Sequence, residues 1–552
     1  MSIKILYGPS GHGKTEYVYS DIVKEACANS DKKYVFIVPE QSSLQAQKRV
    51  VRMHPSHGVF NIDVLTFGRL CYRVFEELQI ELKETIDDTG KNLIVRKILN
   101  NIKSDFRIIK AGRRQGFVSE MKSMISELKQ YGITPDMLKE IAVSAGSDRL
   151  RDKLEDISLI YSEFENYIRD RFVTVEDKPE LLYRFIDNSD LLKGSTVVFD
   201  GFTGFTPVQY RLIEKIALQA ENIIVTVTIS SPAINNINTD MGMDELFYMS
   251  KDMIRKLGVI ADNVRIPFLM QRIESDHSKY RFRNSPALNF LEENIFRYNG
   301  NTFGGNTEDI HISEHLNGKE EIQYAAAAIL KEVRTHGYRF NDIGVILGDK
   351  DNFANETARI FKESGIPFFM DNKRSLIGNP MVEYIRGIIA LIKERFSYEV
   401  VFRVLKNGLC GFERDKVNIF EDYILAFGIN GFDRYCEKFV RAYKSKEMGL
   451  DVINEVREDF CCLISEFYSD MTKGTKVSDY VNAVYDFMEK ENLYEEMEML
   501  ADNTEDEDKA EEFRKSYGHV VTLLERIYDM LGDETMTVKE FAEIMDAGFE
   551  EI

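Results

Sequence analysis

The stretch IKILYGPSGHGKT (3–15) decides the fold, because it joins an apolar strand to a glycine-rich turn and then to a helix. Residues 8–15 fit the pattern GxxxxGK[ST] without exception, and they stand where its mechanism requires, between a strand and a helix. In such a loop, backbone N–H groups surround phosphate oxygens and the helix N-terminus adds partial positive charge. A chance glycine-rich turn would not need this context, so the stretch predicts an α/β domain with a nucleotide site.

A second strand, in VVFDGF (197–202), ends in the carboxylate that a P-loop needs for Mg²⁺. Lys14 would reach the β- and γ-phosphates, and the Thr15 hydroxyl would bind the metal beside Asp200. We therefore predict that ATP and Mg²⁺ bind at Gly8, Ser10, Gly11, Gly13, Lys14, Thr15 and Asp200, with Thr15 and Asp200 as the metal ligands.

The residue after this carboxylate bears on hydrolysis. In hydrolysing P-loop proteins of the helicase kind, a Glu normally follows the Asp and activates the attacking water. Here Gly201 follows, and the nearest downstream carboxylate is Glu214. The sequence thus favours nucleotide binding strongly and efficient hydrolysis weakly, and we assign no catalytic residue.

Further apolar runs extend the first unit. Strands are expected in YVFIVP (34–39), VFNIDVLTF (59–67), STVVFDGF (195–202) and ENIIVTVTIS (221–230). Strands that alternate with helices imply a parallel sheet with right-handed crossovers. We assign residues 1–84 and 195–300 to this first core, and residues 85–194, which carry apolar residues at helical spacing, to a helical insertion.

A second α/β unit is expected over residues 305–380. DIHISEHL (309–316), DIGVILGD (342–349) and IPFFMD (366–371) read as strands, with a helix over 319–337. Residues 381–552 read as helical again, which suggests a second insertion. Within it, residues 489–515 are strongly acidic and predict a solvated helix face or a loop.

Two loops beside the P-loop carry side chains suited to single-stranded nucleic acid. VPEQSSLQ (38–45) and LTFGRLCYRVF (65–75) both follow strands on the side where ligands bind in open α/β folds. Amides, hydroxyls and a guanidinium contact phosphates and base edges, and aromatic rings stack on bases. The candidates are Gln41, Ser43, Thr66, Phe67, Arg69 and Tyr72, joined by Phe202 and Phe205 after the Asp200 strand. The alternative is that Phe67 belongs to the buried face of a helix with Leu70 and Val74.

Net charge alone argues against DNA, because 71 basic and 92 acidic side chains give a formal net charge of −21. The distribution is uneven, however. Between Arg96 and Arg114 seven basic residues face only Asp105, a local excess of six positive charges. That run predicts a phosphate-contacting surface, a partner-facing patch or a solvated helix face.

The remaining composition fits a soluble cytoplasmic protein. No stretch approaches the roughly 18 apolar residues of a membrane-spanning helix, and the N-terminus lacks the features of a signal peptide. The six cysteines are scattered without a CxxC pair, so we expect reduced thiols.

Taken together, these motifs resemble the AddB subunits of bacterial AddAB (RexAB-type) helicase–nucleases. The matching segments are YGPSGHGKT (7–15), VPEQSSLQAQ (38–47), LTFGRLCYRVF (65–75), VVFDGFTGFTPVQ (197–209), RFRNSPALNFLEENIF (281–296), GYRFNDIGVILGD (337–349) and IPFFMDNKRSLIGNPMVEYI (366–385). They are spaced as in that family and cover most of residues 1–430.

The resemblance implies a superfamily 1 helicase-like fold with two RecA-like cores and helical insertions. It implies a heterodimer with an AddA-type partner that supplies the unwinding motor, contact with single- and double-stranded DNA, Chi recognition and a role in recombinational repair. The family's nuclease domain and 4Fe-4S cluster lie in a C-terminal part that this chain does not match, so we expect an N-terminal portion of a longer protein.

The family's strand-sensing motifs match Gln41, Ser43, Phe67, Arg69 and Tyr72, with Phe202 or Phe205. The sequence departs from common forms of the family at Tyr72, where Trp is frequent, and at Ser43, which is often Thr. Two other functions stay open at this point. One is an active P-loop NTPase or phosphotransferase, and the other is an interaction scaffold with a vestigial P-loop.

Overall fold

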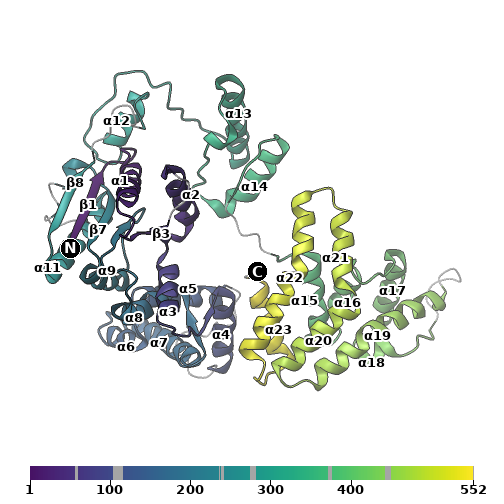
Figure 1. The fold of residues 1–552 in the computed structure, drawn as a ribbon. Coiled ribbons are helices and arrows are strands. Elements are labelled where there is room, and N and C mark those ends of the chain that lie inside the picture. The colour runs from purple at the N-terminus through teal and green to yellow at the C-terminus, as the bar shows by residue number, and fades with distance from the viewer. Residues whose placement is uncertain are drawn as a thin grey trace.

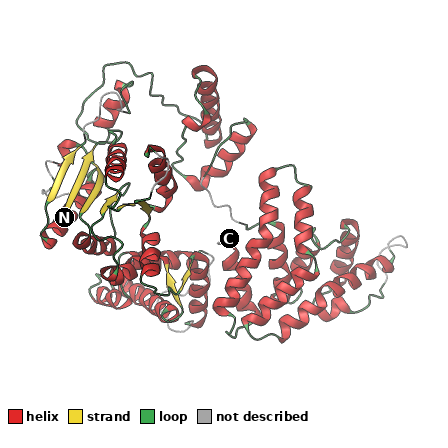
Figure 2. Cartoon of the chain, viewed as in Figure 1, coloured by secondary structure: helices red, strands yellow, loops and turns green. Residues whose placement is uncertain are grey.

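The computed structural model describes residues 1–55, 60–102, 116–234, 237, 242–273, 281–370, 376–441 and 449–550. An α/β part at the N-terminus leads to a pair of helices and then to a long helical part at the C-terminus (Figure 1). Strands are confined to the N-terminal part, and the rest of the described chain is helix and loop (Figure 2). The expected α/β class with helical insertions is therefore confirmed.

Six parallel strands form the main sheet, in the order β3-β2-β6-β7-β1-β8. They are β1 (Ser2–Gly8), β2 (Tyr34–Ile37), β3 (Ile62–Leu65), β6 (Thr196–Phe199), β7 (Asn222–Thr228) and β8 (Phe268–Arg272). Every residue of β2 and β6 is buried, as expected for strands covered on both faces. Five of the six were predicted, and β8, an edge strand, was not.

Helices cover both faces of this sheet. On one face, α1 (Lys14–Ala28) and α2 (Ser43–Met53) pack against Leu6, Phe36 and Val198. On the other, Ile5, Ile37 and Val225 pack against α3 (Phe67–Glu77), α8 (Lys178–Phe185), α9 (Pro207–Gln219) and α11 (Tyr248–Val264). Successive strand residues point to opposite faces, so both clusters draw on the same strands.

The first insertion is helical, as predicted. It contains α4 (Asp88–Asn101), α5 (Phe117–Gln130), α6 (Pro135–Val143) and α7 (Asp148–Ile168). Two short parallel strands, β4 (Glu84–Ile86) and β5 (Phe172–Thr174), pair with each other just before α4 and just after α7 in the chain. Neither strand was predicted from the sequence. After the insertion the chain returns to the first core at α8, which packs on α3 and α9. This return lies before residue 195, where the sequence places the end of the insertion.

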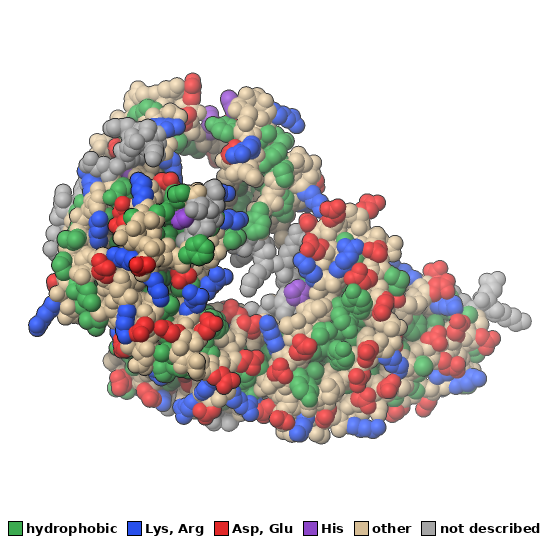
Figure 3. All heavy atoms as spheres, viewed as in Figure 1, with side chains coloured by type: hydrophobic (Ala, Val, Ile, Leu, Met, Phe, Trp, Pro, Cys, Tyr) green, Lys and Arg blue, Asp and Glu red, His purple; other side chains and the backbone are tan. Residues whose placement is uncertain are grey.

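The C-terminal part is helical throughout its described residues. Its helices are α15 (Pro380–Lys393), α16 (Tyr398–Leu405), α17 (Arg414–Phe427), α18 (Phe432–Cys436), α19 (Leu450–Lys473), α20 (Val477–Lys490), α21 (Leu493–Asp502), α22 (Glu507–Leu531) and α23 (Val538–Phe549). The acidic stretch 489–515, predicted as either a solvated helix face or a loop, falls largely on the helices α21 and α22. On the face shown in Figure 3, acidic side chains are scattered over this part instead of gathered in one patch.

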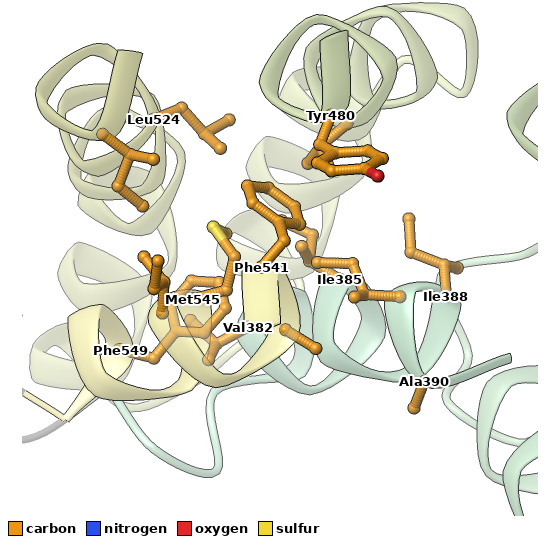
Figure 4. Packing of buried hydrophobic residues seen from close by; sticks show 14 of the residues in the cluster. Val382, Ile385, Ile388, Ala390, Tyr480, Leu524, Phe541, Met545 and Phe549 are labelled. Carbon is orange, nitrogen blue, oxygen red and sulfur yellow. The ribbon is translucent and has the colours of Figure 1, made fainter. Parts of the chain in front are cut away.

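The two insertions share one hydrophobic core. Ile94 of α4 and Phe164 of α7 belong to the same buried cluster as residues of α15, α20, α22 and α23. Figure 4 shows the centre of this cluster, where Phe541 and Met545 of α23 lie against Val382 and Ile385 of α15.

Polar contacts cross the same junction between the insertions. Arg96 pairs with Glu543 at 3.2 Å, and Lys97 with Glu534 at 2.5 Å. Tyr167 donates a hydrogen bond to the Met530 carbonyl at 2.9 Å. The helices that precede and follow residues 305–370 in the chain therefore form one packed body.

Residues 305–370 differ from the expectation. They form α13 (Gly318–His336) and α14 (Lys350–Glu363), which pack together, but the described residues contain no strand there. The strand predictions at 309–316, 342–349 and 366–371 are therefore wrong for the described residues. A strand needs a neighbour to pair its N–H and C=O groups, and no described segment pairs with these three.

Exposure of apolar side chains in these segments agrees with the missing pairing. Ile312, Ile346 and Phe369 are each more than nine-tenths exposed. On the face drawn in Figure 3, a gap separates the N-terminal core from the α13–α14 pair.

Short elements complete the chain. They are α10 (Ser231–Ile234), α12 (Pro286–Asn294) and the 3₁₀ turns at Glu40–Ser42, Val175–Asp177, Ile186–Asn188 and Phe340–Asp342. In the part of the chain that the structure describes, no helix is both long and apolar enough to cross a bilayer.

We predict that Phe541→Ala destabilises the helical body by about 3–5 kcal/mol, because the ring is fully buried in the shared core. Phe369→Ala is the matched control, since the same truncation at a 92 % exposed ring changes the free energy of unfolding by about 0.5 kcal/mol at most. Denaturant unfolding followed by circular dichroism measures both. Equal effects of the two variants would contradict the shared core.

Candidate nucleotide site and the loops beside it

The candidate residues meet at the carboxyl edge of the sheet, because all of its strands are parallel. Backbone hydrogen bonds continue past the strand ends and tie the loops together: Val38 N donates to Leu65 O at 3.0 Å, and Asp200 N donates to Ile37 O at 3.2 Å. Ile229 N donates to Gly8 O at 3.1 Å. The P-loop, both candidate DNA loops and the loop after Asp200 therefore lie along one edge.

The P-loop turns into α1 through a glycine in the left-handed region. Gly13 has φ +78°, and nothing lies within 4 Å of where its Cβ would be. The conformation is therefore what requires glycine here. The next residue, Lys14, is buried, and its ammonium donates to the carbonyls of Gly8 at 2.9 Å and Pro9 at 2.8 Å.

Thr15 and Asp200 lie within hydrogen-bond distance, as the sequence predicts for a metal pair. The Thr15 hydroxyl donates to Asp200 Oδ1 at 3.2 Å. Thr226 of β7, the strand between β1 and β6, donates to the same oxygen at 2.6 Å and orients the carboxylate. Thr226 was not predicted from the sequence as a site residue. Its position beside Asp200 can be inferred only when the strand order is known.

The donor set suits Mg²⁺. This ion prefers oxygen ligands and in nucleotide sites takes few from protein, the rest coming from water and phosphate. A hydroxyl and a carboxylate meet that requirement. Among the described residues there is no group of three or more His, Cys, Asp and Glu side chains placed to hold a metal.

A cleft of about 720 Å³ opens over the P-loop. That volume falls within the roughly 300–1,000 Å³ of small-molecule sites. Its walls include Lys14, Thr15 and Asp200, together with the guanidinium-bearing residues Arg49, Arg281 and Arg283. The cleft is therefore rich in positive charge where phosphates would lie.

None of these three arginines was predicted as a site residue. Arg49 stands on α2, and the other two stand in the segment RFRNS, which in the sequence supported only the family resemblance. The structure places that segment on the P-loop: Arg281 N donates to Gly11 O at 3.3 Å, and a Cβ on Gly11 would lie 3.0 Å from Arg281 Cβ.

Gly201 follows the metal carboxylate directly and has φ +83°, a backbone conformation that glycine favours. The position at which a helicase-type base would stand therefore carries no side chain. The backbone there also disfavours any residue that has a Cβ.

Burial lowers the pKa of Lys14 to about 8, against an ordinary lysine value of about 10.4. Desolvation of the ammonium is the main cause; the negative charge of Asp200 opposes it, and the charge of Arg281 adds to it. A bound phosphate would supply the negative charge that this buried ammonium lacks.

Three of the candidate DNA residues are exposed at the edge: Gln41, Arg69 and Tyr72. Tyr72 is held in place, because Lys178 donates to its hydroxyl at 2.9 Å and Thr85 lies 3.3 Å from the same oxygen. The hydrogen bond from Lys178 lowers the pKa of the Tyr72 phenol. The residue as a whole is 46 % exposed, and the Lys178 ammonium lies over the ring, 4.6 Å from its centroid.

Three others are buried, and their burial argues against direct DNA contact in this conformation. Thr66 caps α3 by accepting a hydrogen bond from Arg69 N at 3.2 Å, and Ser43 is buried at the start of α2. Phe67 is 8 % exposed and packs against the rings of Phe199 and Phe202. The buried-helix-face alternative therefore holds for Phe67.

Phe202 and Phe205 are half-buried and form a small aromatic cluster with Phe199 and Tyr210. The ring centroids of Phe202 and Phe205 are 5.0 Å apart, and that of Phe205 lies 5.5 Å from Phe199 and from Tyr210. These contacts stabilise the loop after Asp200 and leave both residues partly exposed, and Phe202 lines the wall of the cleft.

The basic run 96–114 is described only at its start. Arg96 and Lys97 lie on α4 and pair with Glu543 and Glu534, so they serve the helical junction. The other five basic residues of the run, at 103–114, lie outside the described residues.

Comparison with known families identifies one match. The family model described as "ADDB, N-terminal" matches residues 5–292, which include the P-loop, both candidate DNA loops, Asp200 and the segment that bears Arg281 and Arg283.

Curated relatives match the whole chain. The chain is 36 % identical over 567 residues to a protein of Lachnoclostridium phytofermentans, 33 % over 565 residues to one of Clostridium kluyveri and 32 % over 571 residues to one of Clostridium tetani. Each of these is named as a subunit of an "ATP-dependent helicase/deoxyribonuclease". The alignments cover 100 % of this chain and 49 % of each relative, so the chain spans about half the length of the curated relatives it matches.

We predict that Lys14 loses its proton near pH 8, below the range of ordinary lysines. Competitive acetylation with trace acetic anhydride across a pH series, read by peptide mass spectrometry, gives its titration midpoint. Asp200→Asn should move that midpoint lower, because the Asp200 charge raises the pKa of Lys14. A midpoint at pH 10 or above in the unaltered protein would contradict the burial of this ammonium.

Proposed function

The chain belongs to the AddB N-terminal family, and on that premise we propose that it is a nucleotide-binding, helicase-like region that contacts single-stranded DNA. It would act within a helicase–nuclease that processes double-strand breaks for recombinational repair. The nuclease chemistry implied by the relatives' name is not assigned to any residue of this chain.

One observation carries the nucleotide proposal. Lys14, Thr15 and Asp200 converge at the carboxyl edge of a parallel sheet, with Thr226 holding the carboxylate toward Thr15. Lys14 would exchange the Gly8 and Pro9 carbonyls for phosphate oxygens, and Arg49, Arg281 and Arg283 would offset the remaining phosphate charge. Thr15 and Asp200 are the residues that would hold Mg²⁺, and the bound ion would supply positive charge beside the phosphates.

Hydrolysis should be slow at this site. Activation of water needs a base within hydrogen-bond reach of the attacking oxygen. Gly201 offers none, and Glu214 lies on α9, where its carboxylate accepts a hydrogen bond from Asn263 at 3.1 Å. We propose that nucleotide binding here sets a conformation and does not drive unwinding.

The DNA proposal is narrower than the sequence alone suggests. Of the candidate residues, Gln41, Arg69 and Tyr72 present their side chains at the edge, and Phe202 and Phe205 present part of theirs. These side chains supply the groups that a single strand would contact as it crosses the loops. Arg69 offers a guanidinium for phosphate, Gln41 offers an amide for a base edge, and the partly exposed aromatic rings offer surface for stacking. Ser43, Thr66 and Phe67 would support those loops from below.

A partner and a location complete the proposal. The relatives are named as subunits, and we propose an AddA-type helicase–nuclease chain as the partner, in the cytoplasm. The net charge of −21 predicts that this chain alone binds DNA weakly and with strong salt dependence. The 4Fe-4S cluster of the family is expected only outside this chain.

Replacing Lys14 tests the nucleotide site. Lys14→Ala should abolish binding of Mg²⁺–ATP in calorimetry, because it removes the phosphate-contacting ammonium, whereas Lys48→Ala on the exposed face of α2 should leave binding unchanged. The unaltered chain should bind ATP and release phosphate very slowly. Vigorous DNA-stimulated turnover would refute the slow-hydrolysis proposal, and no ATP binding at all would favour the vestigial scaffold.

Replacing Arg69 tests the DNA loops. Arg69→Ala should weaken binding of a single-stranded oligonucleotide and reduce the slope of log K against log salt by about 0.7, the value for one lost phosphate contact. Arg514→Ala, on α22 of the C-terminal part, removes the same charge away from these loops and is the matched control. Fluorescence anisotropy over a salt series measures both. Equal slopes for the two variants would place the strand elsewhere.

A further inference from the structure

Two thiols face each other between α18 and α19 of the C-terminal part. Cys461 donates its S–H to the sulfur of Cys436, and the two sulfurs are 2.9 Å apart. Both cysteines are half-buried free thiols, so solvent reaches the pair. They lie 25 positions apart in the sequence, which gave no sign of the pairing.

Packing on both sides fixes this approach. Arg457 donates through Nη1 to the Cys436 carbonyl at 2.9 Å and through Nε to Asn454 Oδ1 at 3.0 Å, which anchors the end of α18 to α19. One turn before Cys436, the ring of Phe432 stacks on Tyr468 with centroids 4.0 Å apart. The two sulfurs can therefore form a bond without a rearrangement of either helix.

We propose that Cys436 and Cys461 are a site of reversible oxidation, at which a two-electron oxidant such as hydrogen peroxide closes an intramolecular disulfide. This proposal does not rest on the nucleotide or DNA sites. The sulfur–sulfur bond of a disulfide is about 2.05 Å long, so closure shortens the present distance by less than 1 Å.

The chemistry balances in two steps. The Cys436 thiolate attacks one peroxide oxygen, the O–O bond breaks, and hydroxide leaves with a proton from solvent as water, which produces a sulfenic acid on Cys436. The Cys461 sulfur then attacks the Cys436 sulfur; the S–O bond breaks, and the departing hydroxide takes the Cys461 proton as a second water. Two thiols and one peroxide thus give one disulfide and two waters.

The hydrogen bond sets the order of these steps. Burial and the contact with Cys436 raise the pKa of the Cys461 thiol to about 12, so Cys461 keeps its proton. Cys436 accepts the hydrogen bond, so its sulfur presents a lone pair to this contact while Cys461 presents its proton. Cys436 is therefore the first nucleophile, and Cys461 resolves the sulfenic acid.

The other cysteines lack this combination. Cys462, next in sequence, is exposed, and so is Cys27 on α1. Cys71 is buried, and burial raises the pKa of its thiol to about 11. Cys410 donates to the Val404 and Leu405 carbonyls at 3.5 Å each. Oxidation should accordingly select the Cys436–Cys461 pair.

The consequence would be a covalent tie across one end of the C-terminal helices. A disulfide restricts the unfolded chain and so stabilises the folded one. α19 packs in the core that the two insertions share, so the tie would stabilise a body to which both insertions contribute.

Peroxide treatment of the reduced 552-residue chain tests the proposal. After removal of peroxide and alkylation under denaturing conditions, four of the six cysteines should remain alkylated, and a tryptic peptide pair joined at Cys436 and Cys461 should appear. Dithiothreitol should restore all six. The oxidised chain should also melt at a higher temperature than the reduced chain.

Variants keep the test decisive. Cys462→Ser should still form the joined pair, whereas Cys436→Ser and Cys461→Ser should each lose both it and the rise in melting temperature. Dimedone should trap a sulfenic acid at Cys436 in Cys461→Ser, which reads out the order of attack even if that variant is less stable. Six alkylated cysteines after peroxide, a Cys461–Cys462 linkage, or dimedone labelling of Cys462 alone would overturn the proposal.

Discussion

Parallel pairing of β7 between β1 and β6 is the constraint on which the candidate site depends. It places β7 between β1, which leads into the P-loop, and β6, which leads to Asp200. From this middle strand the Thr226 hydroxyl donates a hydrogen bond to Asp200 at 2.6 Å. Because the neighbouring strands also run parallel, their loops emerge at the same edge. Parallel strand pairing thereby brings together the glycine-rich turn, Asp200 and the exposed polar side chains of the neighbouring loops.

The helical parts obey a different constraint. Residues on either side of the α13–α14 pair, hundreds of positions apart, bury apolar surface against each other, with Ile94 and Phe164 in the same cluster as Phe541. Neither insertion is closed by itself, since α4 presents its buried face to α23 as well as to α5 and α7. The hydrophobic effect thus holds the two insertions together.

Sequence reasoning succeeded where the signal is local. The P-loop motif, five of the six strands and the helical character of residues 85–194 and 381–552 follow from apolar period and glycine positions, which are readable within a few residues. It failed where the outcome depends on partners. Strand β8 exists because β1 offers it an edge, whereas Ile312 and Ile346 sit in strand-like patterns that no described segment pairs. The same limit applies to sites: Phe67 is aromatic in a loop-like setting, but only the structure shows that Phe199 and Phe202 bury it.

The backbone at Gly201 constrains how this site can change over evolutionary time. Its φ is +83°, and an added Cβ would lie 3.6 Å from the Pro39 ring, an ordinary contact, so the backbone conformation is what disfavours other residues. A codon change that restores a carboxylate after Asp200 would therefore place a side chain on a backbone that disfavours it, at a cost of about 1–3 kcal/mol. A carboxylate at position 201 would therefore add backbone strain unless the turn changed together with the residue, so a single substitution there carries a stability cost as well as a chemical effect.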